Sequence, residues 1–129
     1  MNNTNMTRIE AIVEGGEKRG KRISFPTLNM SADQNNLEDG IYISETEIEG
    51  QWLPSVTFIG KAITFDDPVW RVETHILDFS RDLYGQKIAV QLLKKIRENE
   101  KFPSTTALIQ QIEVDIVRAR EYFFTHQAE

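Results

Sequence analysis

Two adjacent runs of β-forming residues constrain the fold of this chain more than any other part of its sequence. Residues 40–48 and 51–59 are rich in β-branched and aromatic side chains, and only Glu49 and Gly50 separate them. A two-residue break that contains glycine usually joins neighbouring antiparallel strands in a hairpin. The chain is therefore expected to be built on an antiparallel sheet.

Further extended segments are expected on both sides of this hairpin. They span residues 8–15, 23–30, 70–79 and 86–93, with loops predicted at 31–39 and around the Asp-Asp-Pro sequence at 66–68. The C-terminal part has a helical period, and Ser104 is a favourable N-cap for a helix that begins at Thr105. Its apolar stripe comprises Leu108, Ile112, Ile116, Ala119 and Phe123. Several short strands followed by one helix predict a mainly β protein, an antiparallel barrel capped by the helix.

The composition fits one globular domain. The chain has 129 residues, of which 40% are hydrophobic, enough for one domain with a core. Residues 1–7 are polar and are expected to form a flexible tail, which leaves 8–129 as the domain. No apolar run approaches the roughly 20 residues of a membrane span, and the N-terminus lacks the apolar stretch of a secretory signal. Because there is no cysteine for disulfides or thiolate metal sites, a cytoplasmic monomer is the simplest expectation.

Charge is unevenly distributed along the chain. The net charge of −5 disfavours a general nucleic-acid binder. Against this acidic background, Lys18, Arg19, Lys21 and Arg22 place four positive charges within five residues. A local positive cluster on an acidic protein suits a polyanionic ligand, whereas the simpler alternative is a solvated turn between two strands.

The residues around and after the basic cluster favour the ligand site. Glycines between residues 15 and 20 let backbone N–H groups approach an anion, which suits a polyphosphate. Pro26 stiffens the chain before Thr27 and Asn29, whose side chains point to one side of an extended segment. A hydroxyl and an amide oxygen in this arrangement suit a hard cation such as Mg²⁺. This segment therefore indicates a site for a nucleotide and magnesium.

Together with motifs further along the chain, this segment resembles the riboflavin kinase family. The motifs are Glu73-Thr74-His75, Asp82-Leu83-Tyr84-Gly85, residues 97–102, and a C-terminal helix containing Asp115 and Ala119-Arg120. They follow the family's order and extend over residues 9–123. The resemblance implies a closed antiparallel Greek-key β-barrel of about six strands with a C-terminal helix. It also implies an ATP:riboflavin 5′-phosphotransferase, which makes FMN and ADP.

The resemblance gives each candidate site residue a role. Thr27 and Asn29 would bind Mg²⁺, the expected cofactor, and Glu73 would accept the proton of the riboflavin 5′-hydroxyl. ATP contacts are expected at Gly15, Gly16, Lys18, Arg19, Gly20, Lys21, Thr27 and Tyr84. Flavin contacts are expected at Arg97, Glu100 and Phe102, because an aromatic ring and polar groups suit a flat heteroaromatic ligand. The expected partners are riboflavin or FMN and ATP or ADP, without nucleic acid or membrane.

Several of these residues also have a purely structural interpretation. Glu73 is one of 20 acidic residues, and outside its motif it would be read as a surface carboxylate. Tyr84 is either a nucleotide contact or an aromatic residue at the barrel rim before a turn glycine. Phe102 is either a flavin contact or part of the core. A structural role is expected for His75, since a single histidine on a strand usually packs or forms a hydrogen bond.

Several positions depart from the family's pattern. Ala11 and Ser24 stand where glycine is usual, Phe58 stands where asparagine is usual, and Ile63 stands where proline is usual. They leave the loop geometry open but remove no proposed catalytic or metal-binding group. The adenylyltransferase domain of bacterial relatives is absent, so FMN and not FAD is the expected product, unless the chain is a piece of a longer protein. The alternatives are a catalytically degenerate flavin- or nucleotide-binding module on the same barrel and, more remotely, a sugar or polyol kinase.

Overall fold

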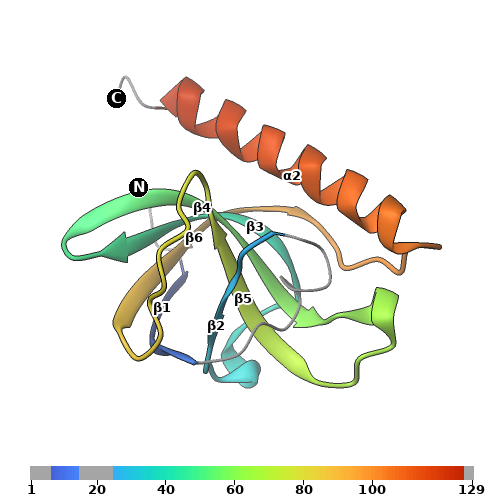
Figure 1. The fold of residues 1–129 in the computed structure, drawn as a ribbon, viewed down its shortest axis with the longest axis horizontal. Coiled ribbons are helices and arrows are strands. Elements are labelled where there is room, and N and C mark those ends of the chain that lie inside the picture. Colours follow the sequence, from blue (N-terminus) through green and yellow to red (C-terminus); the bar gives the residue numbers. More distant parts are fainter. Residues whose placement is uncertain (1–6, 15–24, 127–129) are drawn as a thin grey trace.

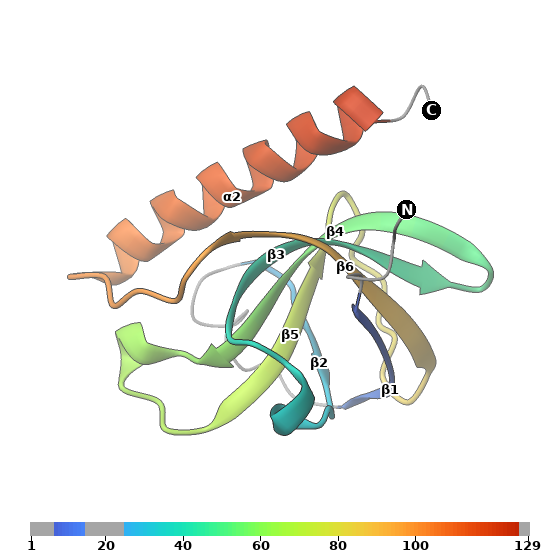
Figure 2. The same ribbon diagram turned by 180° about the vertical axis from the view of Figure 1, so that it is seen from behind.

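The computed structural model describes residues 7–14 and 25–126. Within them, six strands close into an antiparallel barrel, and one long helix lies along its outside (Figures 1 and 2). The strands are β1 (Thr7–Glu14), β2 (Leu28–Met30), β3 (Gly40–Ile48), β4 (Gln51–Lys61), β5 (Trp70–Ile76) and β6 (Lys87–Arg97). The helix, α2, spans Thr105–His126, and two 3₁₀ helices span Gln34–Asn36 and Ile63–Phe65. The predicted closed barrel with a C-terminal helix is confirmed.

The strand order explains how distant parts of the sequence meet. Around the barrel the order is β1-β2-β5-β4-β3-β6, so β3 lies across the barrel from β2 and the chain between them crosses over, as in a Greek key. The predicted hairpin is confirmed, because β3 and β4 pair along the whole of β3. Its turn residues Glu49 and Gly50 have φ angles of 52° and 83°, the left-handed values that a two-residue hairpin turn needs.

Three strand boundaries differ from the predicted ones by three residues or more. β2 begins only at Leu28, because Pro26 has no N–H to donate to a sheet; the predicted start at residue 23 lies outside the described residues. β5 ends at Ile76 and not at residue 79, because Asp78 turns the chain with a φ of 58°. β6 runs to Arg97 and not to residue 93, and its pairing with β3 takes up two register shifts.

The segments expected to be irregular are partly ordered. The predicted loop at 31–39 contains the 3₁₀ helix Gln34–Asn36, which Asp33 caps by accepting the Asn35 N–H at 2.9 Å. The 3₁₀ helix Ile63–Phe65 was not predicted. β1 begins at Thr7, so this residue belongs to the sheet and not to the predicted tail, whose other residues lie outside the described part.

The barrel interior combines an apolar core with a chain of hydroxyl groups. The core residues include Ile9, Val13, Met30, Tyr42, Ile48, Ile59, Val72, Ile76, Leu83, Ile88, Val90 and Leu92. The interior also contains five fully buried hydroxyl side chains that are joined by hydrogen bonds of 2.7–2.9 Å, in the order Thr46, Ser55, Ser44, Thr57, Thr74. Polar groups inside the barrel therefore satisfy one another across β3, β4 and β5.

A second core lies between α2 and the outside of the barrel. Ser104 caps the helix as predicted, because its Oγ accepts the Ala107 N–H at 3.1 Å. All five residues of the predicted stripe pack against this core, which includes Ile43, Val56 and Phe58 of the barrel. Asp115 is buried on the same side of the helix, which the apolar pattern did not predict. No helix within the described residues is long and apolar enough to cross a membrane.

Candidate active site

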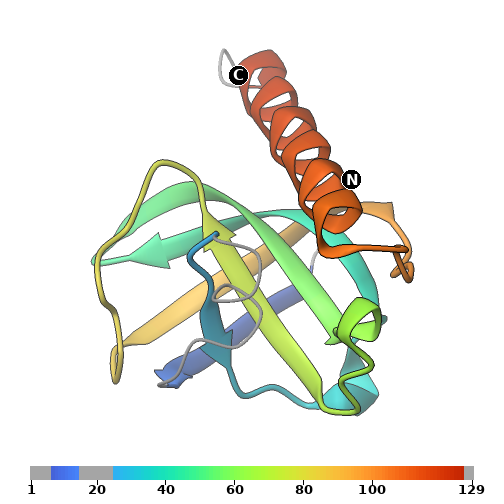
Figure 3. The same cartoon turned by 45° about the vertical axis from the view of Figure 1, so that its right-hand side comes forward.

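A row of paired residues around the outside of the barrel brings most of the candidate site together. Asn29 pairs with Glu73, Glu73 with Phe58, Phe58 with Ile41, and Ile41 with Arg97. Paired residues face the same side of a sheet, and neighbouring strands lie about 4.8 Å apart. The register therefore places the predicted metal ligand beside the predicted base on β2 and β5, which are adjacent in Figure 3. We call these five residues the outer row.

The end of the outer row on β2 and β5 is buried. Asn29 is 4% exposed, and Glu73 is fully buried. Thr27 immediately precedes β2, and its Oγ1 is buried without a hydrogen-bond partner among the described residues. A buried hydroxyl in this state is costly unless a ligand or an ion completes its interactions, so this oxygen fits the role of a metal ligand. Together with the amide of Asn29, it offers the neutral oxygen chemistry that Mg²⁺ accepts beside phosphate groups.

His75 fastens the chain in front of Thr27. Its Nδ1 lies 2.7 Å from the carbonyl oxygen of Pro26, and its ring meets that of Phe25 edge to face, with 5.6 Å between centroids. His75 lies two residues after Glu73 and therefore faces the same side of β5. The structural role predicted for this histidine agrees with these contacts, which hold the segment leading into Thr27 against β5.

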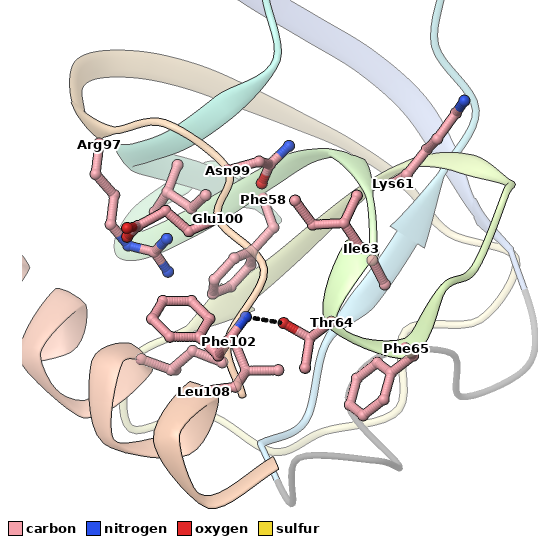
Figure 4. A pocket seen from close by; sticks show the side chains of 13 residues that line it. Phe58, Lys61, Ile63, Thr64, Phe65, Arg97, Asn99, Glu100, Phe102 and Leu108 are labelled. Carbon is pink, nitrogen blue, oxygen red and sulfur yellow. Dashed lines mark hydrogen bonds between the residues drawn. The ribbon is translucent and has the colours of Figure 1, made fainter. Parts of the chain in front are cut away.

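An apolar pocket opens at the other end of the outer row (Figure 4). Its cavity volume is about 30 Å³, and it continues into open solvent. Its walls come from β3, β4, the 3₁₀ helix Ile63–Phe65, the end of β6 with the chain after it, and the first part of α2. All three predicted flavin contacts, Arg97, Glu100 and Phe102, line this pocket, together with Phe58 of the outer row. Lys61 points away from the other labelled side chains in Figure 4.

Arg97 and Phe102 are held in place within the pocket wall. The Arg97 guanidinium lies 5.6 Å from the centroid of the Phe102 ring and forms an ion pair with Asp115 of α2. The Phe102 N–H donates to Oγ1 of Thr64 at 3.1 Å. These contacts fix an aromatic ring and a planar cation side by side, an arrangement that suits a flat heteroaromatic ring system.

Tyr84 lies close to the end of β1, where the predicted phosphate loop begins. Its side chain is 68% exposed, whereas Leu83 before it is fully buried in the barrel core. The Gly85 N–H donates to the carbonyl oxygen of Val13 at 2.9 Å, and the Val13 N–H donates to that of Gln86 at 2.9 Å. The Tyr84 ring is therefore not part of the core, and the backbone just after it is bonded to the end of β1.

The remaining predicted ATP contacts lie outside the described residues. They are Gly15, Gly16, Lys18, Arg19, Gly20 and Lys21. Ser24, one of the departures from the family's pattern, lies outside them too.

The other departures lie in ordered structure, and Phe58 is a buried residue of β4. Ile63 opens the 3₁₀ helix that forms one side of the pocket, so a proline is not needed for that turn. Ala11 lies within β1 and pairs with Ile88 of β6.

Gly60, at the end of β4 beside the pocket, has a φ of 130°. A Cβ on it would come within 2.3 Å of the Asn99 side chain, which donates to the Ile59 carbonyl oxygen at 3.0 Å. Glycine at 60 therefore lets the chain after β6 close onto β4.

Sequence reasoning missed part of the pocket. Phe58 and the segment 63–65 were noted only for their differences from the family's motifs. Neither was assigned to a pocket, because nothing local to them marks a wall built from several separate segments. Gln111 was not considered, although its amide donates to Asp115 Oδ1 at 3.1 Å. Asp115 gave a usable signal, since an acidic residue on the buried side of a helix needs a partner.

Comparison with known proteins gives consistent matches. A family model described as Flavokinase: Riboflavin kinase matches residues 4–123. A bifunctional riboflavin kinase/FMN adenylyltransferase of Haemophilus influenzae is 36% identical over 118 residues, which cover 90% of this chain and 38% of the relative. A Bacillus subtilis protein named RNA-binding riboflavin kinase is 36% identical over 112 residues, which cover 86% of this chain and 49% of the relative. The chain therefore spans less than half the length of these relatives.

A solved structure supports the fold. The crystal structure of riboflavin kinase from Trypanosoma brucei superposes with a TM-score of 0.66 and 22% identity, covering 98% of this chain and 85% of the other. At this level of identity, the similarity shows a shared barrel with a C-terminal helix.

Proposed function

The chain belongs to the riboflavin kinase family, and we propose that it transfers the γ-phosphoryl group of ATP to the 5′-hydroxyl of riboflavin, giving FMN and ADP. The observation that carries this proposal is the outer row. It joins an oxygen-rich buried site at Asn29 and Glu73 to an aromatic pocket at Phe58 and Arg97. A substrate with a flat ring system and a polyol tail needs both parts, at neighbouring positions of one surface.

Thr27 and Asn29 are the proposed holders of Mg²⁺. The buried Oγ1 of Thr27, without a hydrogen-bond partner among the described residues, supports this assignment. When bound, Mg²⁺ neutralises charge on the phosphate oxygens of ATP. Because both side chains are neutral, they hold the ion without reducing the positive charge that it offers to the phosphates.

Glu73 is the proposed base. It lies directly opposite Asn29 in the β2–β5 ladder, so the proton acceptor stands beside the metal site. A hydroxyl that attacks the γ-phosphate loses its proton in the reaction, and a carboxylate within hydrogen-bond reach can accept it. His75 contributes by holding the Pro26 carbonyl, and with it the segment that carries Thr27, against the same face of β5.

The pocket is the proposed site of the isoalloxazine ring. Phe58, Phe65 and Phe102 supply apolar area, and Arg97 and Glu100 supply polar groups at its edge. Because Phe58 is the register partner of Glu73, a ring in this pocket would direct its ribityl chain along the outer row toward the base. Only one strand spacing, about 4.8 Å, separates the pocket wall from Glu73.

The remaining assignments belong to the same proposal. The glycine-rich basic segment (Gly15, Gly16, Lys18, Arg19, Gly20 and Lys21) would hold the ATP phosphates, with Tyr84 beside it. The tie between Gly85 and Val13 supports this placement of Tyr84. We also propose a cytoplasmic monomer that does not act on nucleic acid. The closed order of the described strands and the net charge of −5 support this part.

The test is to incubate the purified protein with riboflavin, ATP and Mg²⁺ and to separate riboflavin, FMN and FAD by chromatography. Glu73→Gln is assayed in parallel, with Glu121→Gln on the exposed side of α2 as the matched control. FMN formation that is lost with Glu73→Gln and kept with Glu121→Gln would support both the activity and the base. FMN is the expected product.

Two results would contradict the proposal. Saturable riboflavin binding without any FMN would favour the degenerate binding module. Phosphorylation of simple polyols in preference to riboflavin would favour a sugar or polyol kinase, and would leave the aromatic pocket without a purpose.

A further inference from the structure

Two ion pairs join α2 to the barrel within the described residues, and they differ in their surroundings. Arg97 at the end of β6 pairs with Asp115, and Arg120 of α2 pairs with Asp78 in the loop after β5. In both ion pairs the arginine binds the carboxylate in a bidentate way, through two nitrogen atoms. Arg97 reaches Asp115 through Nε at 2.9 Å and Nη2 at 2.7 Å, and Arg120 reaches Asp78 at 2.9 and 3.0 Å. The Asp115 side chain is fully buried and that of Arg97 is 12% exposed, whereas those of Arg120 and Asp78 are 51% and 73% exposed.

The buried pair forms part of the wall of the pocket. Arg97 lines it, and so do Leu108 and Ile112 of the same helix that carries Asp115. Gln111 fixes the carboxylate from behind, because its amide donates to Asp115 Oδ1 at 3.1 Å. Asp115 itself does not line the pocket. Its carboxylate acts on the pocket only through Arg97.

The pairing leaves the guanidinium with donors to spare. Asp115 takes Nε–H and one Nη2 hydrogen, and the Glu98 carbonyl oxygen accepts from Nη1 at 3.3 Å. A guanidinium has five N–H donors, so one on Nη1 and one on Nη2 remain for a ligand. An arginine side chain has several rotatable bonds, and fixing it in advance spares a ligand the loss of entropy that ordering would bring.

We propose that Asp115, supported by Gln111, is a positioning residue that holds the Arg97 guanidinium across Phe102 and thereby sets riboflavin affinity. The inference rests on the proposed function, because it assigns the pocket to the flavin ring. The pair at Asp78 joins the same helix to the same barrel at the surface, outside the residues that line the pocket. A substitution at Asp78 therefore removes an ion pair between α2 and the barrel without changing the position of Arg97.

The experiment compares Asp115→Asn with Asp78→Asn, two substitutions of the same chemistry on the same helix–barrel interface. Riboflavin affinity is measured by quenching of flavin fluorescence, and the KM for riboflavin, the KM for ATP and kcat are measured separately. We expect Asp115→Asn to weaken riboflavin binding about tenfold, equivalent to about 1.4 kcal/mol. The KM for ATP should change by less than about twofold, and Asp78→Asn should bind riboflavin like the wild type.

Asp115→Asn leaves a buried arginine with a weaker partner, so a charge-retaining variant is needed as well. Asp115→Glu keeps the ion pair but moves the carboxylate by one methylene, which shifts the guanidinium relative to Phe102. We expect this variant to fold and still to bind riboflavin more weakly than the wild type. Together, the two variants separate stability from positioning.

The outcomes are distinct. If folded Asp115→Asn or Asp115→Glu binds riboflavin as tightly as the wild type, or if the affinities for riboflavin and ATP fall together, the positioning role is wrong. If the wild-type protein itself does not bind riboflavin, the proposed function is wrong, and this inference fails with it. Weaker riboflavin binding in the Asp115 variants alone supports the role.

Discussion

Polar side chains on the two faces of β5 have different surroundings. On the interior face, the hydroxyl of Thr74 bonds to that of Thr57 at 2.9 Å, at the end of a chain of five linked hydroxyls. On the outer face, Glu73 lies beside Asn29, and the nearby Oγ1 of Thr27 is buried without a hydrogen-bond partner among the described residues. Glu73 and Thr74 are consecutive residues of β5, and both are fully buried.

The contrast distinguishes polar groups that hold the fold together from groups kept ready for a ligand. Buried polar atoms in folded proteins are nearly always hydrogen-bonded, and the barrel interior follows this rule. The oxygen of Thr27 departs from it beside the paired residues Asn29 and Glu73, where we propose that Mg²⁺ binds. Substitutions on the interior face should therefore lower stability, and substitutions on the outer face should lower activity.

The largest effect is expected for Glu73→Gln. Removing a general base typically lowers the rate about 10²- to 10⁴-fold, and glutamine preserves the size of the buried side chain. Riboflavin binding and the unfolding temperature should stay close to those of the wild type. Single-turnover FMN formation, fluorescence titration and thermal unfolding measure these three quantities. A variant with full activity would remove Glu73 from the mechanism, and a variant that does not fold would place it with the structural residues of the interior face.

The opposite result is expected for Thr57→Val, on the interior face. Valine has nearly the same shape but leaves the hydroxyls of Ser44 and Thr74 each without one partner. We expect a loss of about 1–3 kcal/mol in the free energy of unfolding, measured in urea. Because Thr57 faces away from the site, kcat should change by less than about twofold. Unchanged stability would show that the chain of hydroxyls does not stabilise the fold. A loss of activity without a loss of stability would show that the interior face, and not only the outer face, serves the reaction.

The sequence predicted most of what local patterns determine. The hairpin at Glu49 and Gly50, the cap at Ser104 and the period of α2 all depend on neighbouring residues, and the structure confirms them. The closure of the barrel was expected from the family resemblance alone, because composition and periodicity indicated only a mainly β chain with one helix. The extent of β2 was predicted less well, because the effect of Pro26 on pairing was underestimated.

The arrangement of the site was harder to predict, because it depends on register between distant segments. Asn29 and Glu73 were chosen as separate motif residues, and no local pattern states that they are direct partners across β2 and β5. The pocket is assembled from four separate stretches of the chain, so nothing local to Phe58 marked it as part of the wall. Asp115 could have been identified, because it falls between Ile112 and Ala119 on the buried stripe, where a carboxylate requires a cation.

A smaller effect is expected for Thr27→Val, which tests the outer face without removing a charge. If Oγ1 is a metal ligand, the Mg²⁺ concentration for half-maximal activity should rise about tenfold, equivalent to about 1.4 kcal/mol. Stability should not fall, because the substitution removes a buried hydroxyl oxygen that has no hydrogen bond within the described residues. Mn²⁺ binding followed by electron paramagnetic resonance measures the metal independently of activity. Thr106→Val on the exposed first turn of α2 is the control. An unchanged metal requirement, or a clear loss of stability, would assign Thr27 to the structural class.

The smallest effect is expected for Asp78→Asn, at the outer surface away from the pocket and the outer row. Hydrogen bonds from Arg120, and its charge, lower the pKa of Asp78 below its ordinary value. A lowered pKa in the folded state means that the pair stabilises the protein above the ordinary pKa of aspartate, and that this contribution is lost as the pH falls through the lowered value. Because both side chains are largely exposed, we expect the unfolding temperature at neutral pH to fall by no more than about 2 °C. The difference from the wild type should shrink in strong acid and in high salt, which calorimetry at several pH values measures. A larger loss of stability at neutral pH would contradict the small contribution expected of this exposed ion pair. Any change in kcat would show that the pair between Arg120 and Asp78 influences the active site, so that residues for stability and residues for catalysis are not separated as the comparison requires.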